Sequence, residues 1–159
     1  MRIAYADPPY IGQAKRHYQS EEVDHAALIK TMTEQYDCWA LSCSTPSLRE
    51  ILNLCPTTVR VAAWVKPFAI FKPNVNPAYA WEPVIFCGAR KRTRTELTVR
   101  DWVNANITLK RGLVGAKPEA FCMWLFALLG AQPTDEFSDL FPSTGAVTRA
   151  WERFSTAFI

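Results

Sequence analysis

The order of the expected secondary-structure elements constrains the fold of this chain more than any other feature of its sequence. Short apolar segments of strand-like composition alternate with segments whose apolar residues recur at helical spacing. This alternation is typical of an α/β fold, in which crossover helices join the strands of a largely parallel sheet and cover both of its faces. Strands are expected at 2–6, 36–44, 57–65, 84–87 and 137–141, and helices at 20–35, 45–54, 118–130 and 145–158.

Proline, glycine and serine residues set several of these boundaries. The run Asp7-Pro8-Pro9 ends the first strand, because two prolines cannot continue a β-ladder. Ser20 is expected to cap the first helix. Pro118 in the first turn and Gly130 after the last turn bound the most apolar helix. Residues 68–83 contain three prolines and are predicted to be mostly loop, and residues 89–112 are basic and only weakly periodic.

Length and composition favour one globular domain spanning residues 1–159. The chain is 49% hydrophobic and 13% aromatic, which is too apolar for a disordered protein. Its net charge of +3 permits a polyanionic partner without requiring one. The five cysteines form no Cys-x-x-Cys pair, and there are only two histidines, so neither a disulfide scaffold nor a metal site is expected.

The sequence gives no sign of membrane targeting. The N-terminus lacks the apolar core of a signal peptide, since an aspartate and two prolines interrupt it early. The longest apolar run, residues 121–131, is far shorter than the ~20 residues that a membrane-spanning helix needs. A soluble cytoplasmic protein with no membrane partner is therefore expected.

The residues that follow the first strand carry the strongest functional signal. Ligands of open α/β sheets bind at the carboxyl ends of the strands, which is where Asp7-Pro8-Pro9-Tyr10 lies. The two prolines fix the backbone, so the Asp7 carboxylate and the Pro8 carbonyl become rigid acceptors beside an aromatic ring. This arrangement suits a planar group that carries an NH₂. An ordinary turn would explain Asp-Pro alone, but the four-residue combination is more specific.

This tetrapeptide resembles the catalytic signature of S-adenosylmethionine (SAM)-dependent methyltransferases that act on exocyclic amines of nucleobases. The Asp-Pro-Pro-Tyr variant is most associated with N6 of adenine in DNA. Four later segments resemble motifs of the same family, namely Trp64-Val65-Lys66-Pro67, Trp81-Glu82-Pro83-Val84-Ile85-Phe86, Gly115-Ala116-Lys117-Pro118-Glu119 and Asp139-Leu140-Phe141-Pro142-Ser143-Thr144-Gly145. The catalytic motif precedes the cofactor motif, as in circularly permuted members, and the chain looks most like small DNA methylases of phages and prophages.

The resemblance implies a Rossmann-like methyltransferase sheet that is circularly permuted and lacks the usual C-terminal strands. It implies a site-specific, adenine-specific DNA methyltransferase in a bacterial cell or a phage-infected host. The implied catalytic residues are Asp7, Pro8, Pro9 and Tyr10. The implied cofactor-binding residues are Ala6, Asp7, Lys117, Asp139, Phe141, Pro142, Ser143, Thr144 and Gly145. Ser143 stands where the motif usually has its first glycine, and Lys117 is equally well explained as a solvated residue before a helix.

Two groups of basic residues are candidates for nucleic-acid binding. A basic loop beside an adenine pocket suits the phosphates that flank a flipped base, although such loops are often only solvated surface. The candidates are Lys15, Arg16, His17, Lys66, Arg90, Lys91, Arg92 and Arg94.

Other functions remain open at this point. A catalytically silent, methyltransferase-like subunit that binds nucleic acid is one alternative. A methyltransferase acting on RNA or on N4 of cytosine is another. The chain has no room for a separate target-recognition domain, so specificity would be short, loose, or built across the two protomers of a homodimer.

Overall fold

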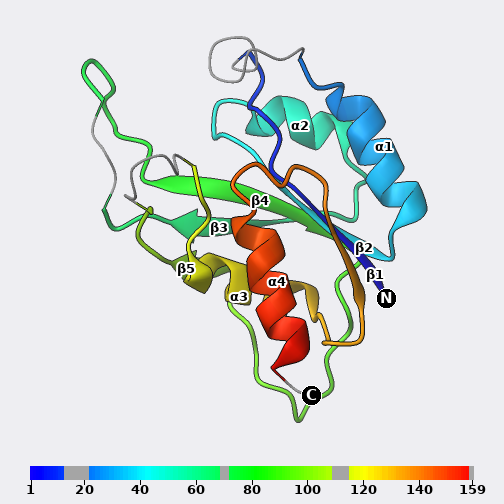
Figure 1. Cartoon of the computed structure of the whole chain (residues 1–159). Coiled ribbons are helices and arrows are strands. Elements are labelled where there is room, and N and C mark those ends of the chain that lie inside the picture. Colours follow the sequence, from blue (N-terminus) through cyan, green and yellow to red (C-terminus); the bar gives the residue numbers. More distant parts are fainter. Residues whose placement is uncertain (13–21, 69–71, 109–114, 158–159) are drawn as a thin grey trace.

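A computed structural model describes residues 1–12, 22–68, 72–108 and 115–157 of the chain (Figure 1). The candidate residues Lys15, Arg16 and His17 and the expected helix cap Ser20 lie outside the described residues.

The described residues form one six-stranded mixed sheet. Its strands are β1 (Arg2–Ala6), β2 (Cys38–Ser42), β3 (Arg60–Val65), β4 (Trp81–Cys87), β5 (Trp102–Asn104) and β6 (Glu136–Asp139), in the spatial order β5-β3-β4-β2-β1-β6. β4 is antiparallel to both of its neighbours, whereas β1 is parallel to β2 and β6, and β3 is parallel to β5. Five strands therefore share one direction, which confirms the expectation of a largely parallel sheet.

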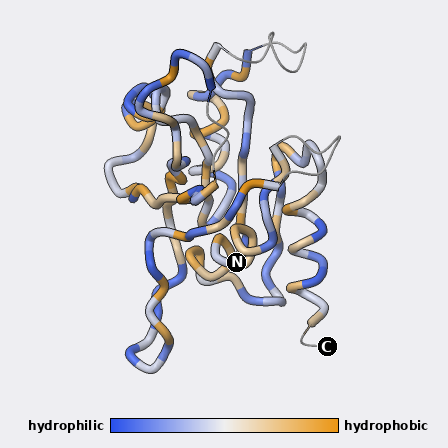
Figure 2. The backbone as a smooth tube through the Cα atoms, turned by 90° about the vertical axis from the view of Figure 1, so that its left-hand side faces the viewer, coloured by the Kyte–Doolittle hydropathy of each residue, from blue (hydrophilic) through white to orange (hydrophobic). Residues whose placement is uncertain are grey.

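Helices cover both faces of the sheet, as expected (Figure 1). They are α1 (His25–Gln35), α2 (Leu48–Leu54), α3 (Glu119–Leu129) and α4 (Ala146–Thr156). Apolar side chains of α1 and α2 join one core cluster, and those of α3 and α4 join the other. Hydrophobic residues gather in the middle of the molecule, whereas the tip of the loop at the lower left is hydrophilic (Figure 2). β2 is buried along its whole length because it is covered from both sides. None of the described helices is long and apolar enough to cross a membrane.

The first helix begins five residues later than expected. Its cap is Asp24, whose carboxylate accepts a hydrogen bond from the Ala27 backbone N–H at 2.9 Å. An aspartate at this position satisfies one of the free N–H groups of the first turn, so the helix begins at His25 and residues 22–24 are not helical. The prediction of a helix from residue 20 was therefore wrong at its start.

Two strands near the basic segment differ from expectation. β4 begins at Trp81 rather than at 84, because Pro83 is tolerated opposite Cys43, just beyond the end of β2. The Pro83 carbonyl accepts a hydrogen bond from the Cys43 N–H at 3.1 Å. Proline has no N–H to donate in return, but the ladder between β2 and β4 already ends at Ser42 and Val84, so no residue of β2 loses a hydrogen bond. β5 was not predicted, because a three-residue edge strand is too short to show a period.

The reversed direction of β4 gives the sheet two functionally different edges. At the carboxyl edge, the five parallel strands end and β4 begins. At the amino edge, β4 ends and the loop of residues 88–101 follows. Figure 1 shows this loop at the bottom of the molecule and the 7–12 segment at the top, so the two lie at opposite ends of the sheet.

Candidate active site

The end of β1 brings Asp7 to the carboxyl edge. Ala6 is fully buried and pairs with Leu41, so the chain leaves the sheet directly at Asp7. The Asp7 side chain keeps 25% exposure, and its Oδ2 lies 3.0 Å from Nζ of Lys117, just before α3. The catalytic candidate is therefore held against a cation and is still open to solvent.

Lys117 belongs to a buried network of four charged side chains. Its Nζ lies 2.5 Å from Oε1 of Glu82, and Nζ of Lys66 lies 2.9 Å from Oε2 of the same carboxylate. The side chains of Glu82 and Lys117 are each 5% exposed. Buried charges are tolerated only when they are paired, and here two ammonium groups balance Glu82 and Asp7. We call these four residues the charge network.

Two aromatic rings pack against the lysines of the charge network. The Trp64 ring centre lies 4.3 Å from Nζ of Lys66 and 5.2 Å from Nζ of Lys117, and the Phe121 ring lies 5.5 Å from the latter. The Trp64 indole N–H donates to the Ala105 carbonyl at 2.7 Å, which fixes the ring. These cation–π contacts hold the two lysines in place.

The two carboxylates of the charge network have pKa values that move in opposite directions. Burial raises the pKa of Asp7; Lys117 opposes this shift, and the negative charge of Glu82 adds to it. Burial also acts to raise the pKa of Glu82, but Lys117 and Lys66 together lower it well below its usual range. Glu82 is paired with two cations, whereas Asp7 shares Lys117 with Glu82, so Asp7 is the carboxylate of the network that is protonated more readily. Although burial acts against it, the two carboxylates raise the pKa of Lys117, which stays charged.

Two tyrosines border this site. Burial, followed by the negative charges of Glu82 and Asp7, raises the pKa of the Tyr10 phenol, and hydrogen bonding to Glu82 adds to the shift. The Tyr5 hydroxyl is fully buried and lies 2.9 Å from Oγ of Ser42. Both phenols therefore remain protonated, and Tyr10 presents a neutral ring next to Asp7.

The loop after β6 supplies the second half of the site. Asp139, the last residue of β6, accepts a hydrogen bond at Oδ2 from the Thr148 hydroxyl of α4, at 2.9 Å. Its Oδ1 is buried and has no hydrogen-bond partner among the described residues. Burial raises the pKa of this carboxyl group. A buried acceptor without a partner is costly, and a donor from a bound ligand would satisfy it.

The turn between Asp139 and α4 is conformationally strained. Ser143 adopts φ of +35°, a region that residues with a Cβ atom rarely enter. Gly145, at φ of +68°, caps α4, and its backbone N–H donates to the Pro142 carbonyl. The Gly145 N–H is therefore used inside the turn and is not free for a ligand.

A pocket joins the two halves of the site. It encloses about 20 Å³, roughly the space of one water molecule. It brings together seven of the nine predicted cofactor-binding residues, namely Asp7, Lys117, Asp139, Phe141, Pro142, Ser143 and Thr144. Ala6 and Gly145 are chain neighbours of this lining, and Tyr5, Gly115, Ala146 and Val147 complete it. No three His, Cys, Asp or Glu residues of the described chain are grouped so as to hold a metal ion.

The charge network changes the interpretation of both predicted lysines. The solvated alternative for Lys117 is wrong, because its side chain is buried and paired with two carboxylates. Lys66 is 19% exposed and bonded to Glu82. Glu82 itself was missed, although an acidic residue between Trp81 and Pro83, in an apolar run, already indicates a buried charge that needs a partner.

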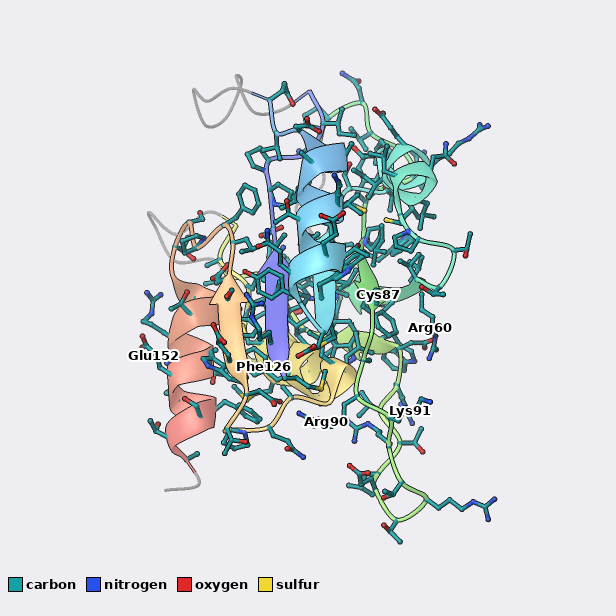
Figure 3. The ribbon with its side chains drawn as sticks, turned by 90° about the vertical axis from the view of Figure 1, so that its right-hand side faces the viewer. Arg60, Cys87, Arg90, Lys91, Phe126 and Glu152 are labelled. Carbon is teal, nitrogen blue, oxygen red and sulfur yellow. The ribbon has the colours of Figure 1, made fainter. Side chains whose placement is uncertain are left out.

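The basic residues at 90–94 belong to the loop that follows β4 at the amino edge, where Figure 3 shows Arg90 and Lys91, whereas Asp7 follows β1 at the carboxyl edge. Arg90 donates to both oxygens of Asp135, each at 2.7 Å, and Arg92 donates to the Ala127 and Leu97 carbonyls. These two arginines therefore stabilise the fold locally, whereas Lys91 and Arg94 are exposed. A cavity of about 530 Å³ at this edge contains balanced charges, since it is lined by Arg60, Arg90 and Arg92 together with Glu96 and Asp101, and Asp135 pairs with Arg90.

Comparison with known proteins identifies the fold. No protein-family model matches the sequence, and no curated protein matches it. A crystal structure of an M1.HpyAVI–SAM complex is similar over 97% of this chain and 78% of its own, with a TM-score of 0.66 at 15% identity. A crystal structure of M1.HpyAVI is similar over 96% and 76%, with a TM-score of 0.62 at 16% identity. These likenesses confirm the α/β fold, and the permutation stays a prediction.

Proposed function

We propose that this chain is a circularly permuted methyltransferase that transfers a methyl group from SAM to the N6 amine of adenine in DNA. One observation carries the proposal: a single pocket connects Asp7, at the rigid end of β1, with the loop that follows β6. The two segments are more than 130 residues apart in the sequence, yet they contain the catalytic and the cofactor motif of the family that the chain resembles.

The residues around the pocket fit SAM chemically. The partnerless Oδ1 of Asp139 would accept a hydrogen bond from the cofactor's ammonium group or a ribose hydroxyl. Phe141 and Thr144 would line its path to Asp7. When bound, SAM supplies an electrophilic methyl group on a positively charged sulfur. Because the pocket holds only about 20 Å³, its lining must open to admit the cofactor. The SAM complex of the structurally similar M1.HpyAVI supports this choice of cofactor.

Asp7 and Pro8 would orient the adenine amine. This amine is a poor nucleophile, because its lone pair is delocalised into the ring. Hydrogen bonds from its two hydrogens to the Asp7 carboxylate and the Pro8 carbonyl would localise that lone pair and direct it at the methyl group. Alignment of this kind is worth roughly 7–11 kcal/mol in favourable cases.

The charge network would prepare Asp7 for this task. Lys117 holds Oδ2 of Asp7 at 3.0 Å, which leaves the second oxygen for the amine. The raised pKa of Asp7 makes it a better acceptor for the proton that the amine loses once it carries the methyl group. Tyr10 would stack on the base and offset part of the few kcal/mol that flipping a base from a duplex costs.

A catalytically silent subunit is the second candidate, and the small size of the pocket favours it. Isothermal titration calorimetry with SAM separates the two functions. The methyltransferase should bind SAM with or without DNA, whereas the silent subunit should show no binding under either condition.

The decisive test is mass spectrometry of digested nucleic acid from cells that express the protein. We expect N6-methyladenine in DNA with the native chain and none with Asp7→Ala. Asp101→Ala, an exposed aspartate at the amino edge, is the matched control and should leave the yield unchanged. Equal yields from native protein and Asp7→Ala would contradict the proposal. N4-methylcytosine in the digest, or methylation of RNA alone, would correct the acceptor.

A further inference from the structure

Three large aromatic side chains are exposed beside the candidate site. Phe68 is 53% exposed, Tyr79 is 56% and Trp81 is 40%. All three lie within two residues of the hydrogen bond from the Lys66 N–H to the Ala80 carbonyl (2.8 Å), which closes the loop between β3 and β4. This loop projects from the carboxyl edge at the upper left of Figure 1. We call the three residues the aromatic platform.

The aromatic platform is continuous with the charge network. Trp81 directly precedes Glu82, and its backbone pairs with Val65, next to Lys66. Successive strand residues point to opposite faces of a sheet, so Trp81 lies on the face of α1 and α2 while Glu82 lies on the face of α3 and α4. Trp81 therefore borders the carboxyl edge from one face, and Glu82 of the charge network borders it from the other.

The charge of this loop indicates what kind of molecule would cover it. Residues 66–81 contain two lysines and no aspartate or glutamate. The acidic residue that follows, Glu82, is buried and neutralised by Lys66 and Lys117. Because Lys66 is paired with Glu82, the excess positive charge of this loop comes from Lys72. Aromatic rings beside a cation are the combination by which proteins bind the bases and phosphates of single-stranded nucleic acid.

We propose that Phe68, Tyr79 and Trp81 stack on the bases of the DNA strand that flank the target adenine. The inference rests on the proposed function, since it places the target base at Asp7. A flipped adenine leaves its neighbours partly unstacked, and a ring stacked on such a base replaces the contact that it has lost. Stacking accepts any base, so the platform adds affinity with little dependence on sequence.

The test is fluorescence anisotropy with a labelled single-stranded DNA, without cofactor, so that binding is measured independently of methyl transfer. Phe68→Leu, Tyr79→Leu and Trp81→Leu should each weaken binding about fivefold or more, and Tyr79→Phe should bind as the native chain does. On a DNA of equal length whose flanking positions are abasic, the leucine variants and the native chain should bind equally. Leu97→Ala removes an exposed apolar side chain (88%) at the amino edge and should have no effect.

Each other outcome overturns the inference. Unchanged affinity in the leucine variants, or the same loss on intact and abasic DNA, removes stacking from the platform. A loss confined to an RNA of the same sequence reassigns the platform to RNA. Unchanged DNA affinity together with loss of a dimer in sedimentation assigns the surface to a second copy of this chain. Circular dichroism and thermal unfolding confirm that each variant is folded. Failure of methyl transfer alone would leave these binding results standing.

Discussion

Among single residues, Glu82 acts on the candidate chemistry without lining the pocket itself. It holds Lys117 and Lys66 by separate oxygens, and its charge contributes to the raised pKa of Asp7. The protonation of Asp7 therefore depends on a carboxylate in another strand. The consequence can be measured in the pH dependence of methyl transfer.

Replacing Glu82 by glutamine should shift the acid limb of the pH–rate profile to lower pH. Asp7 must be ionised to accept the amine, so activity rises as pH rises through its pKa. Without the charge of Glu82, Lys117 faces Asp7 alone and the pKa of Asp7 falls. The variant should also be less stable by about 3–5 kcal/mol, because it leaves a buried cation without its carboxylate partner. The measurement is kcat/KM from pH 4 to 9. Glu136→Gln, 71% exposed, is the control and should retain the native profile.

Replacing Ser143 by glycine should stabilise the protein by about 0.5–1 kcal/mol. At φ of +35° a residue with a Cβ atom is strained by roughly 1–2 kcal/mol, and glycine relieves that strain at an extra entropy loss of roughly 0.5–1 kcal/mol. Thermal unfolding measures the change. Ser155→Gly, inside α4, is the opposite case and should lose stability. A lower melting temperature for Ser143→Gly would show that the turn is not strained.

The site residues divide into those that local sequence predicts and those that it does not. Asp7 directly follows β1, and Asp139 and the 141–144 turn lie at and just beyond the end of β6, so their position in the chain already implies the carboxyl edge. The role of Lys117 depends on Glu82, and that pairing depends on the register of β4, which no local pattern contains. For the same reason, the amino-acid sequence could not show that Arg90 forms an ion pair with Asp135.

At the scale of elements, the central strands and the helix that ends at Gly130 were predictable because burial and capping leave strong local signals. β5 and the beginning of α1 were not, since one is an edge strand of three residues and the other depends on which of several polar residues caps the helix. Pro83 shows the limit most clearly. Proline normally excludes a strand because it lacks an N–H for the ladder. Pro83 is tolerated inside β4 because the neighbouring strand β2 has already ended opposite it.

The junction after β4 should tolerate almost no added side chain. A Cβ atom on Gly88 would lie 2.2 Å from the Asp37 carbonyl oxygen, and φ there is +71°. Gly88→Ala should therefore cost more than about 2 kcal/mol, since a backbone shift is added to the conformational strain. Gly12→Ala is the matched control, because Gly12 has φ of +76° but no atom of the described residues within 4 Å of its Cβ position. Urea unfolding of both variants should give a clearly larger loss for Gly88→Ala, and equal losses would contradict the close approach.

At the scale of the whole molecule, the fold class follows from the alternation of elements, whereas the sheet order does not. Whether β4 runs parallel or antiparallel is decided by its pairing with β3, which precedes it, and with β2, from which α2 and β3 separate it in the sequence. Ion pairs between residues distant in the sequence also stabilise the amino edge. Asp135 joins the Met1 ammonium group at 2.6 Å with Arg90, which follows β4.

Removing the charge of Asp135 should destabilise the whole fold. Its side chain is 4% exposed, and although burial acts to raise its pKa, hydrogen bonds from Arg90, the N-terminal ammonium group and Gln132 lower it. Asp135→Asn leaves these cations unpaired and should cost about 3 kcal/mol at pH 7. A lowered pKa contributes stability above the unfolded value of 3.8, and this contribution is lost as pH falls through the folded pKa. The difference in the free energy of unfolding between the native protein and Asp135→Asn, measured with urea, should therefore become smaller below pH 3.8.

The control for Asp135→Asn is Glu119→Gln, which breaks the ion pair with Arg153. Both side chains of that pair are 57% exposed, so the change should stay under about 1 kcal/mol. A loss for Asp135→Asn as small as that of the control would show that the amino edge is not held together by charge.

The reversed direction of β4 also means that changes made in the loop after Cys87 lie at the opposite end of the sheet from the candidate site. Its seven residues place Trp81 and Glu82 about 20 Å from the loop that follows Cys87. The tip of that loop, around Arg94, is exposed and lies far from the pocket. A fluorophore, an affinity tag or an inserted module could be attached there while the opposite rim of the sheet keeps its shape, which makes this loop the natural handle for immobilising or fusing the protein.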